Sequence, residues 1–144
     1  MADEPLPGGV DPQHAVEMAN DAIRGTLMER MGIEWVEIGA GRLVARMPVA
    51  GNEQVYGVLH GGATATLCET VGSFGTAVVV GLDRRVVGIQ LSVNHLRSVS
   101  NGHVTCTGTP VRVGRRVAVW DLRVADDGGD PVAVATLTVS IRDP

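Results

Sequence analysis

Lysine is absent from this chain, and all 12 basic residues are arginine. A mechanism in which a lysine amine forms a Schiff base with the substrate is therefore excluded. The 16 acidic residues give a net charge of −4, which disfavours a nucleic-acid-binding protein. Aromatic residues make up only 3% of the chain, so base stacking on aromatic side chains is disfavoured as well.

Cysteine is also scarce, and the two cysteines, Cys68 and Cys106, form no C-x-x-C pair. We expect both to be free, reduced thiols of the core rather than a disulfide. The spacing of His, Cys and Asp resembles no metal site, and the G-x-S-x-G motif of serine hydrolases is missing. The N-terminus has no signal-peptide pattern and no stretch of 18 residues is uniformly apolar, so we expect a cytoplasmic protein without a membrane partner.

The length of 144 residues and an apolar content of 44% predict one globular domain. Acidic residues, prolines and glycines are frequent in residues 1–11, for which we expect a disordered tail. The domain is then expected to occupy residues 12–144.

A helix is expected at the start of this domain. Asp11 is a suitable N-cap and Pro12 a suitable first-turn residue, and the helix would run to about Met31. Gly25 is a weak point within it, and Gly32 is a suitable stop.

The longest apolar stretch, at about residues 61–80, predicts a helix that is buried on nearly all sides. Its bulky residues recur at helical spacing: Leu67, Val71, Phe74 and Val78. Strands are expected at 33–38, 42–49, 87–94, 103–113, 116–125 and 132–141. In the third of these, alternation predicts one apolar face. The last four strands, with a hairpin turn at Asn101-Gly102, predict an antiparallel meander wrapped around the long helix, in the α+β class.

His60, Gly61 and Gly62 stand where a polar loop enters this long helix. The first turn of a helix has unpaired N–H groups, and the helix dipole adds partial positive charge there. Such a terminus suits a carbonyl oxygen that becomes negative during acyl transfer. The alternative is that the glycines only permit a tight turn between the loop and the helix.

A single carboxylate, Glu69, lies in the same helix, nine residues after His60. Ser73 lies one turn later on the same face, away from the bulky apolar residues. An ionised carboxylate that is buried without a partner costs several kcal/mol. We therefore predict that Glu69 is a catalytic base or nucleophile, with a structural ion pair to an arginine as the alternative.

Three further positions have polar side chains that suit a binding site. His95 and Arg97 end one face of their strand, where they predict either an anion site or a solvated strand end. Gln54 is in the loop before the His60 motif and is most simply an ordinary loop residue.

The segment GVLHGGATATLCET, residues 57–70, resembles the signature of the hotdog-fold thioesterases. The closer likeness is to the branch of phenylacetate-pathway and aryl-CoA thioesterases, which includes 4-hydroxybenzoyl-CoA and 1,4-dihydroxy-2-naphthoyl-CoA hydrolases. VNHLRSVSNGHV resembles the nucleotide-binding strand of this family, and VGRRVAVWDLRVADDGG resembles its last hairpins. The resemblance extends from about residue 32 to residue 142, and the helix before it is less typical of the family.

The resemblance implies hydrolysis of an acyl-CoA, either aryl or medium-chain, to a free acid and CoA, with no metal or cofactor. Glu69 would be the nucleophile or general base, and the Gly61 N–H would polarise the thioester carbonyl. His60 would orient the carbonyl or the helix entrance. Gln54 would position water or the departing thiolate, and Ser73 would hold Glu69 or the acyl group. The family's site is shared between two chains of a homodimer, with Glu69 and Ser73 from one chain and the other three residues from its partner.

By the same resemblance, the CoA phosphates would bind at His95, Arg97 and Ser98, and dimers would pair into a homotetramer. Two alternatives to a thioesterase stay open. One is a non-catalytic acyl-CoA-binding protein with the hotdog fold. The other is a hotdog dehydratase or hydratase, which the position of the glutamate after the histidine and glycines disfavours.

Overall fold

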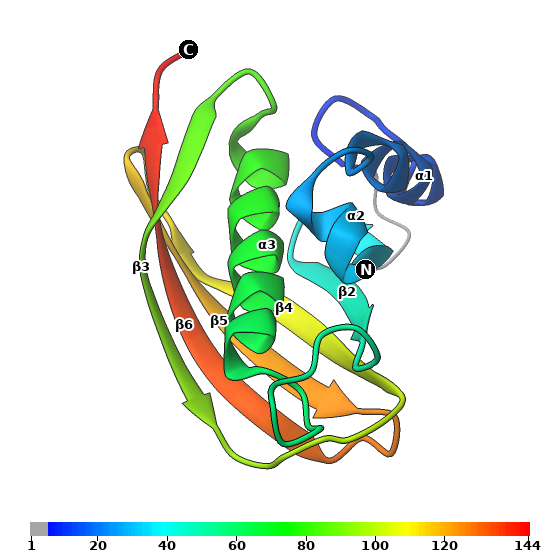
Figure 1. The fold of residues 1–144 in the computed structure, drawn as a ribbon. Helices are drawn as coiled ribbons and strands as arrows, with labels where there is room; N and C mark the ends of the chain where they lie inside the picture. Colours follow the sequence, from blue (N-terminus) through cyan, green and yellow to red (C-terminus); the bar gives the residue numbers. More distant parts are fainter. Residues whose placement is uncertain (1–5) are drawn as a thin grey trace.

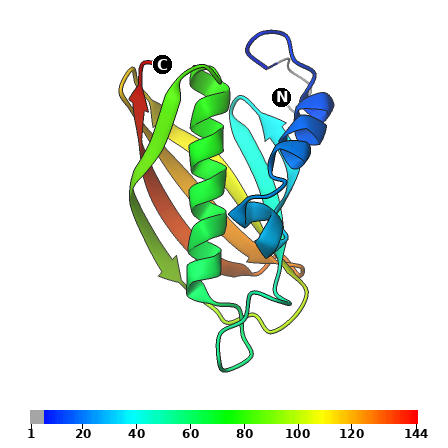
Figure 2. The same ribbon diagram turned by 45° about the horizontal axis from the view of Figure 1, so that its top comes forward.

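The computed structural model of the chain describes residues 6–144. The elements, in chain order, are α1 (Pro12–Ala22), α2 (Leu27–Met31), β1 (Glu34–Gly39), β2 (Arg42–Pro48), α3 (Gly61–Val80), β3 (Arg85–His95), β4 (His103–Val113), β5 (Val117–Asp126) and β6 (Pro131–Arg142). The six strands form one antiparallel sheet that curves around α3 (Figure 1). Figure 2 shows α1 and α2 on the β1 side of α3. The predicted α+β class, with a sheet wrapped around one long central helix, is confirmed.

The core helix α3 packs closely on the sheet because glycines face it. A Cβ atom on Gly75 would lie 2.6 Å from the ring of Trp120, and one on Gly72 would lie 2.6 Å from Leu137. Trp120 Nε1 donates a 2.8 Å hydrogen bond to the hydroxyl of Thr76, so the buried indole is satisfied. By length and hydropathy α3 could cross a membrane, but half of its apolar stretch is buried within the chain.

The order of the strands is β1-β2-β4-β5-β6-β3, which corrects the predicted four-strand meander. Only β4, β5 and β6 form a meander, because β3 pairs with β6 and β4 pairs with β2. Residues 96–102 therefore cross from one edge of the sheet toward its interior, and Asn101-Gly102 does not close a hairpin. This segment is bound to the loop before α3, where Leu59 N donates to the carbonyl of Val99 and Val49 N donates to the carbonyl of Gly102.

The single helix predicted for residues 12–31 is divided into α1 and α2. Gly25 adopts a φ of 75° between them, which interrupts the helical backbone. The predicted ends are confirmed, since the Asp11 carboxylate accepts a 3.0 Å hydrogen bond from His14 N and Gly32 closes α2 with a φ of 69°. Of the tail expected to be disordered, residues 1–5 lie outside the described residues. The described part turns back on itself and buries Leu6.

The strand β3 forms one edge of the sheet, and its apolar alternation is broken. A bulge that begins at Gly88 shifts the register against β6. Val87 and Ile89 are consequently 53% and 58% exposed, whereas Leu91 and Val93 pack against the core. The expected single apolar face of this strand is therefore wrong for its first half.

Candidate functional site

The N-terminus of α3 is capped by the histidine that precedes it. His60 Nδ1 accepts a 2.8 Å hydrogen bond from Gly62 N, and the His60 carbonyl accepts from the N–H groups of Ala63 and Thr64. A neutral imidazole in this role carries its proton on Nε2. Within residues 6–144, the N–H of Gly61 has no protein acceptor. The capping pattern therefore leaves one free donor at the positive end of the helix dipole.

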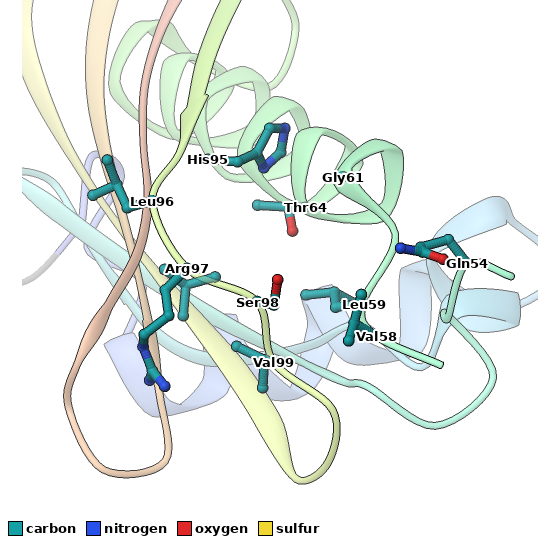
Figure 3. Close-up of a pocket in the computed structure, with 11 residues that line it drawn as sticks. Gln54, Val58, Leu59, Gly61, Thr64, His95, Leu96, Arg97, Ser98 and Val99 are labelled. Carbon is teal, nitrogen blue, oxygen red and sulfur yellow. The ribbon is translucent and has the colours of Figure 1, made fainter. Parts of the chain in front are cut away.

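A pocket of about 420 Å³ opens at this helix terminus. Gly61 lines the pocket together with four other predicted site residues: Gln54, His95, Arg97 and Ser98 (Figure 3). The structure thus brings together residues from the loop before α3, the start of α3 and the segment after β3.

Within this pocket, His95 and Arg97 lie in different places although the sequence separates them by one residue. The ring of His95 lies against the first turn of α3, where a Cβ on Gly61 would be 3.0 Å from His95 Nε2. In Figure 3, the Arg97 side chain extends away from that helix turn, and Ser98 lies between Arg97 and Gln54. A ligand atom bound to the Gly61 N–H would therefore be close to His95.

Arg97 is held by two carboxylates of the β5–β6 turn. Its guanidinium forms an ion pair with Asp126 and lies 3.7 Å from Asp130. Asp126 also accepts hydrogen bonds from Gly128 N and Asp130 N, at 3.0 and 2.9 Å, so the turn is fixed around this arginine. The positive charge expected to bind phosphates is therefore partly neutralised within the chain.

The loop that carries Gln54 is anchored by its neighbour Asn52. Asn52 Nδ2 donates to the backbone carbonyls of Met31 and Pro48, at 2.8 and 2.9 Å. The backbone carbonyl of Asn52 accepts a hydrogen bond from His60 N. Gln54 Oε1 accepts from Tyr56 N. Asn52 is thus a structural residue that positions the loop.

Glu69 and Ser73 do not line the pocket at Gly61 but a second pocket, of about 360 Å³. Both are half-buried, and Ser73 Oγ donates a long hydrogen bond of 3.5 Å to Glu69 Oε1. No ion pair involves Glu69 within residues 6–144, so the alternative of a structural pair with an arginine is not supported. The remaining lining of this pocket is almost entirely apolar.

The two pockets are separated along α3. Gly61 and Glu69 are eight residues apart, which corresponds to a rise of about 12 Å in an α-helix. One group bound to the Gly61 N–H is therefore out of reach of the Glu69 carboxylate of the same chain. A single chain does not unite Gln54 and Gly61 with Glu69 and Ser73.

Gly88 is a site residue that the sequence alone did not identify. A Cβ at this position would overlap the Glu69 carboxylate, so a side chain at residue 88 would displace the acid from its observed position. A glycine inside a strand is a signal for a bulge or a close approach, and both are present here. Among the described residues, no group of three His, Cys, Asp or Glu side chains could hold a metal ion.

Comparison with known proteins gives a consistent result. The family model described as the thioesterase superfamily matches residues 56–133. The proofreading thioesterase EntH of Cronobacter turicensis is 35% identical over 127 residues, which cover 88% of this chain and 93% of that protein. A thioesterase structure from Haemophilus influenzae has a TM-score of 0.86 at 33% identity, covering 89% of this chain and 90% of that one. A thioesterase variant from Pseudomonas aeruginosa also has a TM-score of 0.86, at 32% identity and with coverage of 88% and 93%.

Proposed function

Because this chain belongs to the thioesterase superfamily and has the hotdog fold of a thioester hydrolase, we propose that its substrate is an acyl-CoA, which it converts to a free acid and CoA. The observation that carries this proposal is the free N–H of Gly61 in the 420 Å³ pocket at the positive end of α3. A donor fixed at that point stabilises the oxyanion that forms when a thioester carbonyl is attacked. A thiolate is a good leaving group, so one carboxylate and a polarising amide suffice.

In the proposed mechanism, the Gly61 N–H of one chain binds the thioester carbonyl and Glu69 of a second chain acts on its carbon. Glu69 either takes a proton from the attacking water or attacks the carbon itself, and water then hydrolyses the resulting anhydride. The C–S bond breaks in both routes, and the proton from water ends on the thiolate or the solvent. Ser73 holds Glu69 by its hydrogen bond, Gln54 positions the water or thiolate, and His60 fixes the helix entrance.

The separation of the two pockets supports a homodimer, since the proposed site would be incomplete in one chain. The edge strand β3 supplies a surface for this pairing, because Val87 and Ile89 are exposed on an unpaired edge of the described sheet. Two β3 strands related by a two-fold axis would continue the sheet and set the two α3 helices antiparallel. Gly61 of each chain would then approach Glu69 of the other. Two such dimers would form the expected homotetramer.

Two properties of the site bear on the substrate. His95, Arg97 and Ser98 line the pocket at Gly61, which suits the phosphates of CoA. The apolar pocket beside Glu69 suits an aryl or medium-chain acyl group.

The test is the release of free thiol from a panel of aryl-, phenylacetyl- and straight-chain acyl-CoAs, with the wild type and Glu69→Gln side by side. We expect turnover by the wild type and a loss of about 100-fold or more in the variant, as is typical for the removal of a catalytic base. Isothermal titration with a non-hydrolysable CoA analogue should show that the variant still binds. Binding without turnover in the wild type would instead support the non-catalytic acyl-CoA-binding protein.

A further inference from the structure

One side chain of α1, Asn20, forms hydrogen bonds with the edge strand of the sheet. Asn20 Nδ2 donates to the carbonyl of Trp35 at 3.1 Å, and Asn20 Oδ1 accepts from Trp35 N at 2.8 Å. Because β1 is an edge strand, Asn20 occupies the place that a neighbouring strand would take. Two hydrogen bonds to one residue fix both the position and the rotation of α1.

This attachment makes α1 a wall of the pocket that contains Glu69. Ala19 and Ala22 of α1 line that pocket, and Ile23 and Met28 continue the same wall toward α2. The two alanines have the shortest apolar side chains, so the space between α1 and α3 is left open. An acyl group whose carbonyl carbon is near Glu69 would extend into this space.

A second apolar pocket, of about 230 Å³, lies beyond the first, between α1 and the C-terminal half of α3. Three residues line both pockets and therefore separate them: Ala19, Ala22 and Phe74. The Phe74 ring packs on Trp35, with the ring centroids 4.7 Å apart and an angle of 38° between the planes. Trp35 thus supports the boundary between the pockets from both helices. Its backbone binds Asn20 of α1, and its ring packs on Phe74 of α3.

We propose that α1, positioned by Asn20, sets the size of the acyl group that the enzyme accepts, and that Ala22 and Phe74 are its specificity-determining residues. The inference rests on the proposed function, since it assigns the acyl group to the pocket beside Glu69. At about 360 Å³ this pocket is near the small end of the range for ligand sites. It fits one aromatic ring or a medium chain, whereas a long chain must pass the boundary between the pockets.

The test compares kcat/KM for acetyl-, benzoyl- and dodecanoyl-CoA in three variants. Ala22→Phe should fill the pocket and lower the ratio of benzoyl to acetyl activity by about tenfold or more, as expected for added volume in an apolar site. Phe74→Ala should join the two pockets and raise the ratio of dodecanoyl to benzoyl activity. Gln13→Phe adds the same side chain at an exposed position of α1 that lines neither pocket, and it should retain the wild-type profile.

Asn20→Ala tests the positioning of α1. It should raise KM for benzoyl-CoA more than for acetyl-CoA and leave kcat for acetyl-CoA close to that of the wild type. A merely structural role would instead lower both activities in proportion to the loss of folded protein. Circular dichroism and melting temperatures identify any variant that fails to fold.

The outcomes separate this inference from the proposed function. If the wild type hydrolyses acyl-CoAs but Ala22→Phe and Gln13→Phe have the same profile, the role of α1 is wrong and the thioesterase activity stands. If the wild type hydrolyses none, the proposed function fails. Titration of the Glu69→Gln protein with benzoyl- and dodecanoyl-CoA then still measures how tightly each acyl group binds in the pocket. Equal affinities with and without Ala22→Phe in that background would also overturn the inference.

Discussion

The carboxylate of Glu69 on α3 lies against the backbone of Gly88 on β3, so closely that any side chain at residue 88 would overlap it. The same glycine begins the bulge that shifts β3 against β6. The position of the proposed catalytic acid is therefore determined by the neighbouring strand as well as by its own helix.

Gly88→Ala should displace the Glu69 carboxylate and lower kcat by about 100-fold, since a shift of about 1 Å in a catalytic group can have that effect. The fold should persist, because Gly88 does not have a positive φ. Thiol release and circular dichroism measure the two effects. Gly41→Ala is the matched control, since a Cβ at Gly41 meets no atom within 4 Å. A Gly88→Ala enzyme with wild-type kcat would mean that the observed position of Glu69 is not needed for turnover.

A shared active site predicts complementation between two inactive variants. Gly61→Pro removes the free N–H at a helix position where proline is tolerated once the His95 ring moves by a few tenths of an ångström. Loss of such a donor lowers kcat by about 100- to 1,000-fold. Glu69→Gln removes the acid. Co-expression of the two should restore roughly a quarter of wild-type activity, because half of randomly formed dimers are mixed and each has one intact site. Mixed dimers as inactive as either parent would show that both groups act within one chain.

Arg97→Ala should raise KM for acyl-CoA by about fivefold with little change in kcat, since an exposed ion pair is worth about 1 kcal/mol at most. Asp130→Asn removes the carboxylate that lies 3.7 Å from Arg97 and should shift KM in the opposite direction. Added salt should reduce the difference between wild type and Arg97→Ala. If KM is the same in all three proteins, the phosphates bind elsewhere.

A hydrogen bond with Cys68, and then burial, raise the pKa of Cys106 well above its ordinary value of 9.0. The folded protein therefore holds this proton more tightly than the unfolded chain does. The resulting stability is fully present below pH 9.0 and is lost as the pH rises through the raised pKa. Urea unfolding under reducing conditions should show a free energy of unfolding that falls above this pH, with a smaller fall in Cys106→Ala. The absence of lysine removes the commonest other source of such a slope.

The same burial has a practical consequence for the thiol assay. Both cysteines are free and buried in the core, so the native enzyme should react with a thiol dye far more slowly than released CoA does. Rapid labelling of the folded protein without substrate would contradict the burial of Cys68 and Cys106.

The sequence was sufficient to predict where a helix begins and ends when these bounds depend on residues close by in the chain. The bounds of α3 follow from the histidine and glycines at its start and from the glycine after its end, and all of these act within one turn. The pairing of β3 with β6 could not be obtained in this way. A turn dipeptide such as Asn101-Gly102 indicates that the chain can reverse there, but not which strands become neighbours.

In the candidate site, too, the sequence identified residues with a local signal and missed those whose role depends on tertiary contacts. Glu69 was identified because a lone carboxylate in an apolar helix needs a chemical reason. Gly88 was not, because its requirement arises from a contact with a residue 19 positions earlier on another element. The different directions of His95 and Arg97 also depend on tertiary structure, since α3 approaches one of them and the β5–β6 turn pairs with the other.

The position of β6 between β5 and β3 has a consequence for biosynthesis. β6 is synthesised after the other five described strands, yet β3 has no other partner in the described sheet. Until β6 has been synthesised, β3 and the adjoining surface of α3 stay uncovered, so the nascent chain is exposed to aggregation during this interval. β6 thus completes the described sheet, and a premature stop codon within it would remove the support of the strand that lies against Glu69.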